Sequence, residues 1–194
     1  MVKYNLKMNN IKITHSLLVE GDEAIEFIES LISLDPEEGT FKTSFLLKPD
    51  GKIGHWFVIQ KLEKNLNIFQ SKEQLEEIKT SLEFYKIRTK CTLGIVEDER
   101  YIKVKINKDT FNFLETPDQE NLLSWKELAI LLELPLPEII EEGLLPNETK
   151  WLDIMVDFNK GCFLGQEQAS RVKFRGRPRR LLTSKGDSQE LIKI

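Results

Sequence analysis

A turn between two β-rich runs constrains the fold more than any other feature of this sequence. The segments FKTSFLL and IGHWFVIQ flank Lys48-Pro49-Asp50-Gly51. Proline presets the backbone for a turn, and glycine accepts the positive φ that many turns require, so the pattern predicts an antiparallel hairpin. A further short run, LNIFQ, follows and extends the expected sheet.

Helices are expected around these strands. Residues 11–20 resemble a strand, and an apolar face at helical spacing follows over residues 24–32. A serine followed three residues later by Gln or Glu opens the segments 71–85 and 124–134. Such a pair satisfies free N–H groups of a first helical turn, so both segments are predicted helices. A short helix is expected at residues 138–142.

The remaining segments add strands to this pattern. Gly21-Asp22 supplies a turn and the N-cap of the first helix. Apolar residues recur with period two over residues 87–93 and 102–106, which predicts two strands. Polar residues dominate residues 107–124, the natural place for a subdivision of the chain. The fold class expected is α+β, built on antiparallel sheets rather than on a doubly wound parallel sheet.

Composition excludes several classes of protein. Lys and Arg number 28 against 32 Asp and Glu, so the overall charge does not indicate a general polyanion-binding protein. The two cysteines, Cys91 and Cys162, are too few for a disulfide scaffold or a self-contained four-thiolate cluster. The N-terminus lacks the apolar core of a signal peptide, and no apolar run reaches membrane-spanning length. We expect a cytoplasmic protein with no membrane partner.

A glycine-flanked cysteine lies near the end of the chain. Gly161 and Gly165 bracket Cys162, which predicts a tight loop with a short helix directly after it. A helix N-terminus, with Lys160 before it and Arg171 after it, would stabilise a Cys162 thiolate. The alternative is that Cys162 fills a small packed space.

Residues 160–167, KGCFLGQE, resemble the K-G-C-[FY]-x-G-Q-E signature of the YgfZ-type folate-binding proteins, and Arg171 matches the arginine after it. Residues 47–52 resemble the L-x-P-x-G-[KR] hairpin of that family, and residues 146–148 resemble its P-x-E. The helix after Gly21 is similar to the G-x-D-x-x-x-F-L opening, although one intervening residue is missing. The similarity covers about residues 11–182.

The resemblance implies a fold related to the glycine-cleavage T-protein, with two interlocked halves around a cavity that admits a reduced folate. The implied cofactor is tetrahydrofolate or a related reduced pterin, and the implied partners are iron–sulfur proteins, including enzymes that modify tRNA. Cys162 is the implied functional thiol. The implied folate-binding residues are Gly161, Cys162, Phe163, Gln166, Glu167 and Arg171. Aromatic surface for a pterin is expected from Trp56, Trp151, Phe158 and Phe163.

Two departures from the related families matter. Aminomethyltransferases carry a catalytic aspartate in a G-G-[IV]-x-D-D context, whereas residues 51–56 read GKIGHW. Aminomethyl transfer is therefore not expected, and His55 is more often a packed or solvated side chain than a replacement base. The C-terminal β-barrel of the family is also expected to be absent, since a short tail, residues 183–194, follows the folate-binding region 1–182.

Alternatives from other classes remain. Residues 171–180 are rich in arginine around Phe174, as in an RNA-binding strip, although nucleic acid is the less favoured partner. A degenerate aminomethyltransferase is a second alternative. A thiol enzyme with Cys162 as nucleophile lacks a partner base, because neither His15 nor His55 has a sequence link to it.

Overall fold

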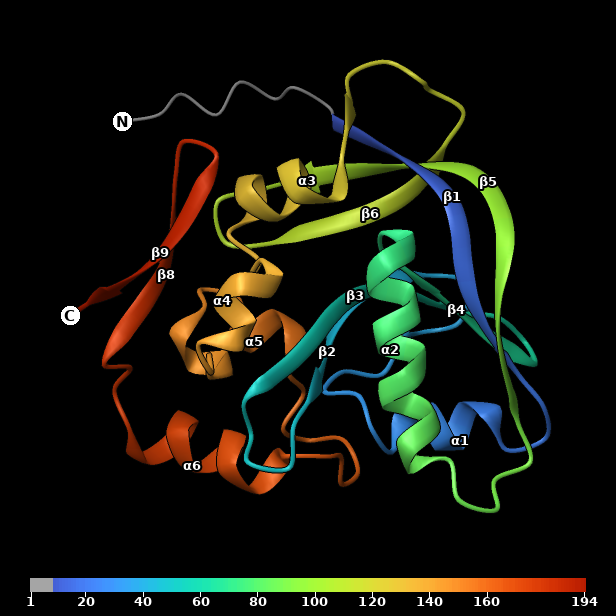
Figure 1. Ribbon diagram of the computed structural model, residues 1–194, viewed down its shortest axis with the longest axis horizontal. Coiled ribbons are helices and arrows are strands. Elements are labelled where there is room, and N and C mark those ends of the chain that lie inside the picture. Colours follow the sequence, from blue (N-terminus) through green and yellow to red (C-terminus); the bar gives the residue numbers. More distant parts are fainter. Residues whose placement is uncertain (1–8) are drawn as a thin grey trace.

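Figure 1 shows the computed structural model, which describes residues 9–194 and all of their side chains except that of Arg175. The elements in chain order are β1 (Asn9–Glu20), α1 (Ala24–Glu29), β2 (Phe41–Leu47), β3 (Ile53–Lys61), β4 (Asn65–Phe69), α2 (Lys72–Tyr85), β5 (Thr92–Ile106), β6 (Phe111–Thr116), β7 (Leu122–Leu123), α3 (Trp125–Leu132), α4 (Pro137–Glu141), the 3-10 helix η1 (Pro146–Glu148), α5 (Leu152–Met155), α6 (Gln166–Arg175), β8 (Arg180–Lys185) and β9 (Ser188–Lys193).

One seven-stranded sheet organises the molecule, in the order β4-β3-β2-β6-β5-β1-β7. An additional antiparallel pairing joins β4 to β1, so six strands form a closed ring of pairings. Among the strands that the structure describes, β7 alone pairs in parallel, beside the start of β1. The link between β2 and β6 is a single residue pair, Phe41 with Phe113. The α+β class on an antiparallel sheet is confirmed.

Two hydrophobic cores lie on opposite faces of the β2–β4 strands. Trp56 and Val58 of β3 face the first core, which α3, α4 and α5 cover. Phe57 and Ile59 face the second core, which α1 and α2 cover (Figure 1). Alternate side chains of a strand point to opposite faces, so one strand serves both cores.

The long strands β1 and β5 extend along both cores. Ile11 and Ile13 at the start of β1 pack in the first core, whereas Leu17 and Val19 pack in the second. The pairing with β5 shifts between Ile13 and His15. Such a bulge bends and twists a strand, and it lies where β1 passes from one core to the other.

Two predicted helices begin where the serine patterns place them. The Ser71 side chain accepts a hydrogen bond from the backbone N–H of Gln74, and α2 ends at Tyr85 as expected. Ser124 and Glu127 form a reciprocal capping box at the start of α3. Each cap contributes about 1 kcal/mol.

The first helix differs from its prediction. Its N-cap is Glu23 rather than Asp22, and the Glu23 carboxylate accepts from the backbone N–H of Lys90 instead of capping the helix. The helix ends at Glu29, since the chain turns and Ile32 forms a bridge to Leu46 of β2. Apolar spacing alone overestimated its length, because the last apolar residues pack from outside the helix.

The strand predicted over residues 87–93 is also wrong in part. Residues 86–91 form a loop in which Ile87 is 76% exposed, and β5 begins only at Thr92. The strand then runs without a break to Ile106, joining what the sequence suggested were two strands. Strands β6 and β7 lie within residues 107–124, and a subdivision there stays a prediction.

The last residues form a hairpin of their own. Strands β8 and β9 pair antiparallel from Arg180 with Lys193 to Lys185 with Ser188, so the short tail expected at 183–194 has a regular structure. In Figure 1 the hairpin stands beside α3 and α4. Among the described residues, no helix has the length and apolar character to cross a membrane.

Candidate functional site

The signature loop, residues 160–167, packs against the hairpin turn, residues 48–52. Gly165 has a φ of +75°, and a Cβ there would lie 2.6 Å from the carbonyl oxygen of Lys48 and 3.2 Å from the Cα of Gly51. A Cβ on Gly51 would lie 2.5 Å from the Cβ of Gln168 on α6. The two segments that resemble family motifs therefore touch through glycines, which explains why both positions need a residue without a side chain.

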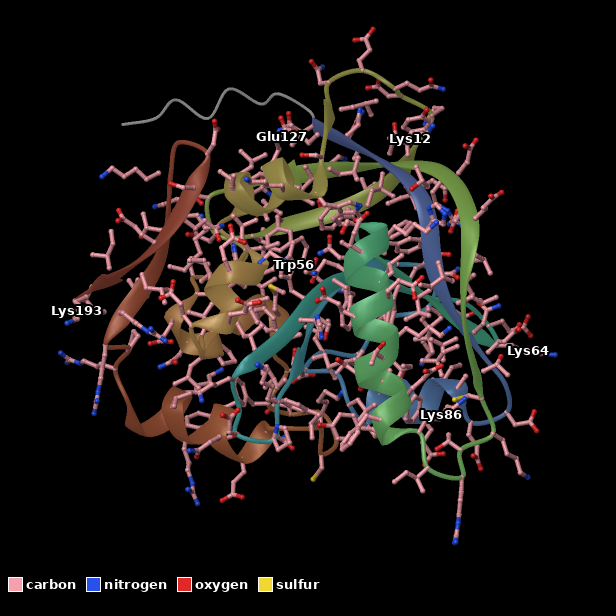
Figure 2. The ribbon with its side chains drawn as sticks, in the orientation of Figure 1. Lys12, Trp56, Lys64, Lys86, Glu127 and Lys193 are labelled. Atoms are coloured by element: carbon pink, nitrogen blue, oxygen red, sulfur yellow. The ribbon has the colours of Figure 1, made fainter. Side chains whose placement is uncertain are left out.

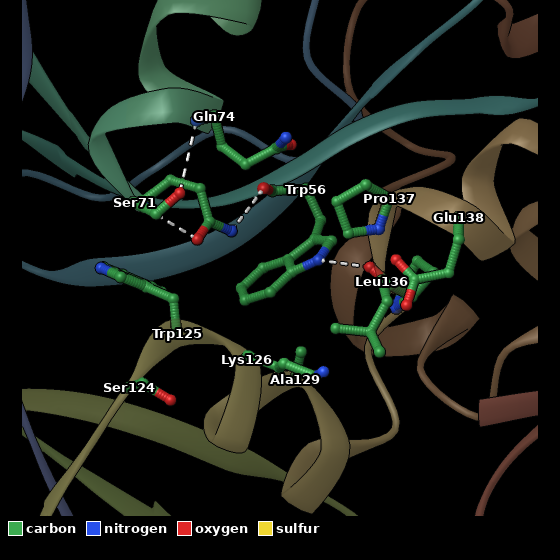
Figure 3. Close-up of a pocket in the computed structure, with 12 residues that line it drawn as sticks. Trp56, Ser71, Gln74, Ser124, Trp125, Lys126, Ala129, Leu136, Pro137 and Glu138 are labelled. Atoms are coloured by element: carbon green, nitrogen blue, oxygen red, sulfur yellow. Dashed lines mark hydrogen bonds between the residues drawn. The ribbon is translucent and has the colours of Figure 1, made fainter. Parts of the chain in front are cut away.

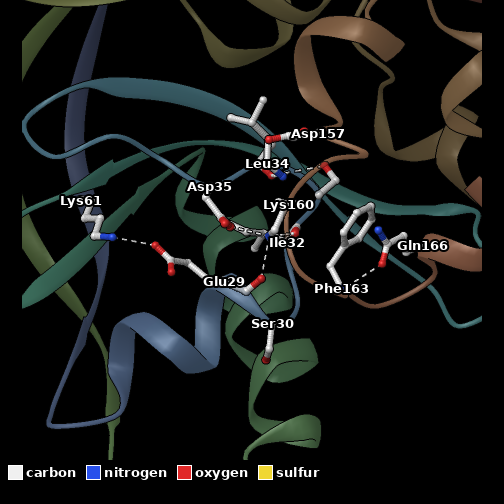
Figure 4. Close-up of polar contacts among 12 residues, drawn as sticks. Glu29, Ser30, Ile32, Leu34, Asp35, Lys61, Asp157, Lys160, Phe163 and Gln166 are labelled. Atoms are coloured by element: carbon white, nitrogen blue, oxygen red, sulfur yellow. Dashed lines mark hydrogen bonds and ion pairs between the residues drawn. The ribbon is translucent and has the colours of Figure 1, made fainter. Parts of the chain in front are cut away.

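Lys160 anchors the start of the signature loop (Figure 4). Its ammonium donates to the carbonyl oxygens of Glu29, at 2.6 Å, and Ile32, at 2.8 Å, and pairs with Asp35. Only 5% of the Lys160 side chain is exposed. Burial raises the pKa of Asp35 and outweighs the opposing effect of Lys160. Lys160 therefore ties the loop to the end of α1, where helix carbonyls lack partners.

Cys162 is exposed, whereas Cys91 is buried. The cations expected to stabilise a Cys162 thiolate are directed elsewhere: Lys160 to α1, and Arg171 to Glu167 at 2.6 Å. Spacing did not reveal these partners, and a role of the two cations at Cys162 stays a prediction. Packing does not explain Cys162 either, since its side chain faces solvent.

The other predicted folate-binding residues have varied surroundings. Phe163 is buried, and its backbone N–H donates to the Gln166 side chain at 3.3 Å, so Gln166 fastens the loop (Figure 4). Glu167 and Arg171 form an i,i+4 pair on the outer face of α6, with 81% of the Glu167 side chain exposed. Gly161 is open, with no atom within 4 Å of an added Cβ.

The P-x-E segment, residues 146–148, forms η1 and carries a buried ion pair. Glu148 accepts from Arg180 Nε at 2.8 Å and from the backbone N–H of Leu145 at 2.9 Å. Arg180 also donates to the carbonyl oxygen of Gly143. The hydrogen bond to Glu148 raises the pKa of Arg180 further above its ordinary value. This pair joins η1 to β8.

A pocket of about 480 Å³ lies between β3, the start of α2, and α3 and α4 (Figure 3). Trp56 forms one wall and Trp125 another, with ring centroids 6.1 Å apart and planes inclined by 58°. Figure 2 shows Trp56 in the interior of the molecule. The Trp56 indole N–H donates to the carbonyl oxygen of Pro135 at 2.9 Å, so the ring is held in place. We call this the Trp56 pocket.

Polar groups complete the Trp56 pocket. The Gln70 side chain donates to the Trp56 carbonyl oxygen at 3.2 Å and accepts from the backbone N–H of Ser71 at 3.0 Å. Gln74, Lys126 and Glu138 also line the pocket. Aromatic faces with a few fixed polar groups are typical of small-molecule sites, and the volume lies within their usual range.

The predicted site residues do not line the Trp56 pocket. None of the six residues expected to bind folate is among its lining residues. Of the four aromatic candidates, Trp56 lines it, while Trp151 is buried and its indole N–H donates to the Leu132 carbonyl oxygen. Phe158 packs instead beneath the ammonium of Lys173, 4.4 Å from its ring centroid. The role of the signature residues in folate binding stays a prediction.

His55 lies on the other face of β3 from Trp56. Its Nε2 lies 3.0 Å from the Ser81 hydroxyl of α2, and its Nδ1 is buried with no hydrogen-bond partner in the part of the chain that the structure describes. Burial lowers the pKa of His55 below its ordinary value of 6.5. His55 and Trp56 therefore occupy the segment where aminomethyltransferases have their aspartates, and neither supplies a carboxylate.

Three cations of the basic strip at residues 171–180 form ion pairs with carboxylates. Arg171 pairs with Glu167, Lys173 with Asp153 at 2.8 Å, and Arg180 with buried Glu148. The side chain of Arg175 lies outside the described residues. Phe174 is 71% exposed, and its ring centroid lies 5.9 Å from that of Phe158.

Comparisons with known proteins bear on this arrangement. No family model matches the sequence. A segment of 85 residues is 29% identical to the tRNA-modifying protein YgfZ of Blochmanniella pennsylvanica (strain BPEN), and covers 40% of this chain and 26% of the relative. The crystal structure of the glycine cleavage system aminomethyltransferase T from Bartonella henselae has a TM-score of 0.64 and 13% identity, and the match covers 90% of this chain and 65% of that one. Part of the sequence therefore resembles YgfZ, and the fold is T-protein-like. Each match spans less than two thirds of the relative's own length.

Sequence reasoning about this T-protein-like chain missed most of the Trp56 pocket. Trp125 of α3, Glu138 of α4 and Gln70 of the loop between β4 and α2 meet only in the folded protein. One signal was present: the capping box at Ser124 fixes the start of α3, and so places Trp125 in its first turn. No local pattern indicated that this turn faces β3.

Proposed function

We propose that this chain binds a reduced folate or a related pterin in the Trp56 pocket, without transferring an aminomethyl group. The observation that carries the proposal is the pair of tryptophan rings bordering a cavity of about 480 Å³ in a T-protein-like fold. A pterin is a flat heterocycle with hydrogen-bonding groups along one edge. Trp56 and Trp125 offer the flat surface that such a ring requires.

The pocket's polar groups suit the edge of a pterin. The ring's amino group and adjacent N–H are donors, and they need acceptors. The exposed Glu138 lines the pocket and has no hydrogen-bond partner among the described residues, and Gln70 is held by two hydrogen bonds. We assign the amino edge to Glu138, because a hydrogen bond to a carboxylate is about twice as strong as one between neutral groups.

The bound pterin would carry one-carbon chemistry only if the protein supplied a proton acceptor near its reactive nitrogens. The Trp56 indole N–H is a donor and is already bonded to Pro135. His55 lies in a separate pocket on the α2 side, with Ser81. Glu138 is assigned to the amino edge, away from those nitrogens, so we propose that aminomethyl transfer does not take place.

The physiological role proposed here is support of tRNA modification and of iron–sulfur proteins, in the cytoplasm. The support is the likeness to a protein named as tRNA-modifying, together with the signature at residues 160–167. Cys162 is the proposed functional thiol, and its exposure leaves it accessible to a partner. An RNA-binding module remains the second reading of the same relationship.

Titration with tetrahydrofolate, followed by tryptophan fluorescence, tests the proposal. Two of the three tryptophans line the pocket, so a bound pterin should quench most of the emission. We expect a dissociation constant in the micromolar range, about −8 kcal/mol. Calorimetry and thermal stabilisation should agree with it, because a ligand of the native state raises the apparent stability.

Matched variants locate the site. Trp125→Ala should weaken binding about tenfold or more, since stacking on one aromatic ring contributes about 1–3 kcal/mol. Glu138→Gln should weaken it, while Glu141→Gln on the same helix should not. If Gln166→Ala weakens binding and Trp125→Ala does not, the ligand lies at the signature loop. No binding of any reduced pterin by the wild-type protein, with retention of RNA, would overturn the proposal in favour of the RNA-binding reading.

A further inference from the structure

A single side chain of the C-terminal hairpin holds the segment between α3 and α4. The Gln189 side-chain oxygen accepts from the backbone N–H of Leu136 at 2.9 Å. Its side-chain nitrogen donates to the carbonyl oxygen of Leu134 at 2.8 Å and to that of Ala129 at 3.3 Å. Gln189 therefore forms hydrogen bonds with the backbone on both sides of Pro135.

The segment around Pro135 lacks some of its backbone hydrogen-bond donors, which explains why a side chain binds it. Pro135 and Pro137 have no backbone N–H, so the segment cannot complete a regular ladder of hydrogen bonds. A glutamine side chain ends in a carboxamide, which offers N–H donors and a carbonyl acceptor of the kinds that a backbone offers. Gln189 supplies from β9 the pairing that a neighbouring strand would supply.

A second contact fixes the hairpin to the end of α3. The Ser184 hydroxyl of β8 donates to the carbonyl oxygen of Ile130 at 2.8 Å, and its backbone N–H donates to Glu133 at 3.3 Å. The hairpin is thus registered against α3 through one residue on each of its two strands. Movement of Gln189 relative to the α3–α4 segment is restricted accordingly.

The segment that Gln189 binds, residues 134–136, forms part of a wall of the Trp56 pocket. Ala129, Pro135 and Leu136 line it, and the carbonyl oxygen of Pro135 receives the Trp56 indole N–H (Figure 3). We propose that Gln189 is a positioning residue of the pocket: it sets the place of the Pro135 carbonyl, and through it the orientation of the Trp56 ring. Its consequence for ligand binding rests on the pterin-binding function proposed above.

Two measurements on the full-length chain test the role. The first follows the indole N–H signals of the three tryptophans by NMR, without ligand. In Gln189→Leu we expect the Trp56 signal to shift and its hydrogen exchange to accelerate about tenfold or more, because the hydrogen bonds that hold the Pro135 segment are lost. The Trp151 signal, bonded to Leu132, is the internal reference. Glu190→Gln, an exposed neighbour on β9, is the matched control and should change neither signal.

The second measurement uses Gln189→Glu. An ionised carboxylate only accepts hydrogen bonds and would face the carbonyl oxygens of Leu134 and Ala129, whereas a protonated carboxyl keeps an acceptor and regains one of the two donors of glutamine. The Trp56 signal of this variant should therefore differ from wild type at neutral pH and return toward the wild-type position as the pH falls through the carboxyl titration. A merely structural substitution would not recover in this way.

Tetrahydrofolate affinity should follow the indole signal, weakening about tenfold in Gln189→Leu and not in Glu190→Gln. An unchanged Trp56 signal in Gln189→Leu and in Gln189→Glu overturns the positioning role. If Gln189→Leu does not fold, the pH dependence of Gln189→Glu decides alone. If the wild-type protein binds no pterin while the Trp56 signal responds as expected, the proposed function fails and the positioning of Trp56 by Gln189 stands.

Discussion

Gly165 and Gly51 lie backbone to backbone, with 3.2 Å between the Cα of Gly51 and the position that a Cβ on Gly165 would take. The contact joins two segments more than 100 residues apart in the sequence. Because both glycines have positive φ values, +75° and +79°, each is constrained by its backbone as well as by its neighbour. The signature loop is therefore built onto the hairpin turn rather than merely adjacent to it.

Alanine at either glycine should destabilise the protein. Gly165→Ala and Gly51→Ala should each lower the free energy of unfolding by more than about 2 kcal/mol, because strain of the left-handed backbone adds to overlap with backbone atoms or with the Cβ of Gln168. Gly39 also has a positive φ, +74°, but no atom lies within 4 Å of an added Cβ. Gly39→Ala should therefore cost only about 1 kcal/mol in denaturant unfolding. Equal costs at all three positions would contradict the contact.

The two cysteines should react at different rates. Cys162 is exposed, whereas Cys91 is 7% exposed and its burial raises the pKa of its thiol. Alkylation of the native protein, followed by mass spectrometry, should modify Cys162 first. Cys162→Ala should leave stability and pterin binding largely intact and abolish rescue of an iron–sulfur enzyme defect in cells, while Cys91→Ala should cost about 1–2 kcal/mol of stability. Full cellular activity of Cys162→Ala would mean that the thiol has no function.

His55 should make the protein sensitive to acid. Its folded-state pKa lies below the ordinary 6.5 because of burial, so the unfolded chain binds the proton more tightly. The stability contributed by neutral His55 is fully present above pH 6.5 and is lost as the pH falls through that value toward the folded-state pKa. His55→Gln should therefore lose less stability than wild type between about pH 7.5 and about pH 5.5. Ser81→Ala keeps the imidazole buried and should retain the wild-type pH dependence in urea unfolding at each pH.

Breaking the Glu148–Arg180 pair should be costly. Glu148→Gln leaves the partly buried Arg180 guanidinium without its counter-charge, and we expect a loss of about 2–4 kcal/mol. Glu167→Gln removes one partner of an exposed pair of similar length and should change little, since solvent screens it. Thermal unfolding of both variants compares them directly. Similar melting temperatures for the two would show that the buried pair contributes no more than the surface one.

Features that depend on neighbouring residues could be predicted from the sequence. The hairpin at Lys48 to Gly51 and the caps at Ser71 and Ser124 follow from local chemistry, and the structure confirms them. Predictions that used apolar periodicity without a cap or turn residue to mark the boundary were wrong in part. Ile87 is exposed in a loop instead of lying in a strand, and the first helix ends at Glu29 instead of reaching Ile32.

The candidate site was less predictable because it depends on contacts between distant residues. The signature identified residues 160–167, but it did not indicate that Lys160 reaches back to the carbonyls of α1. The Trp56 pocket combines side chains from β3, α2, α3 and α4, and its wall depends on Gln189 in a segment expected to be a tail. The direction of a long side chain and its contacts with distant residues leave no periodic pattern in the sequence, so they could not be predicted from it.

The strands β1 and β5 have a consequence for how the protein folds. They pair residues 9–20 with residues 92–104, and each contributes side chains to both cores. Neither core can be completed until the roughly 70 residues between the two strands have been closed into a loop, which slows folding. Once the two strands have paired, they link the two cores. Unfolding of one core then removes packing contacts from strands that the other core also needs. A chain with two separate cores should accordingly unfold in one cooperative step, and a ribosome-bound nascent chain should gain stable structure only after residue 106 has emerged.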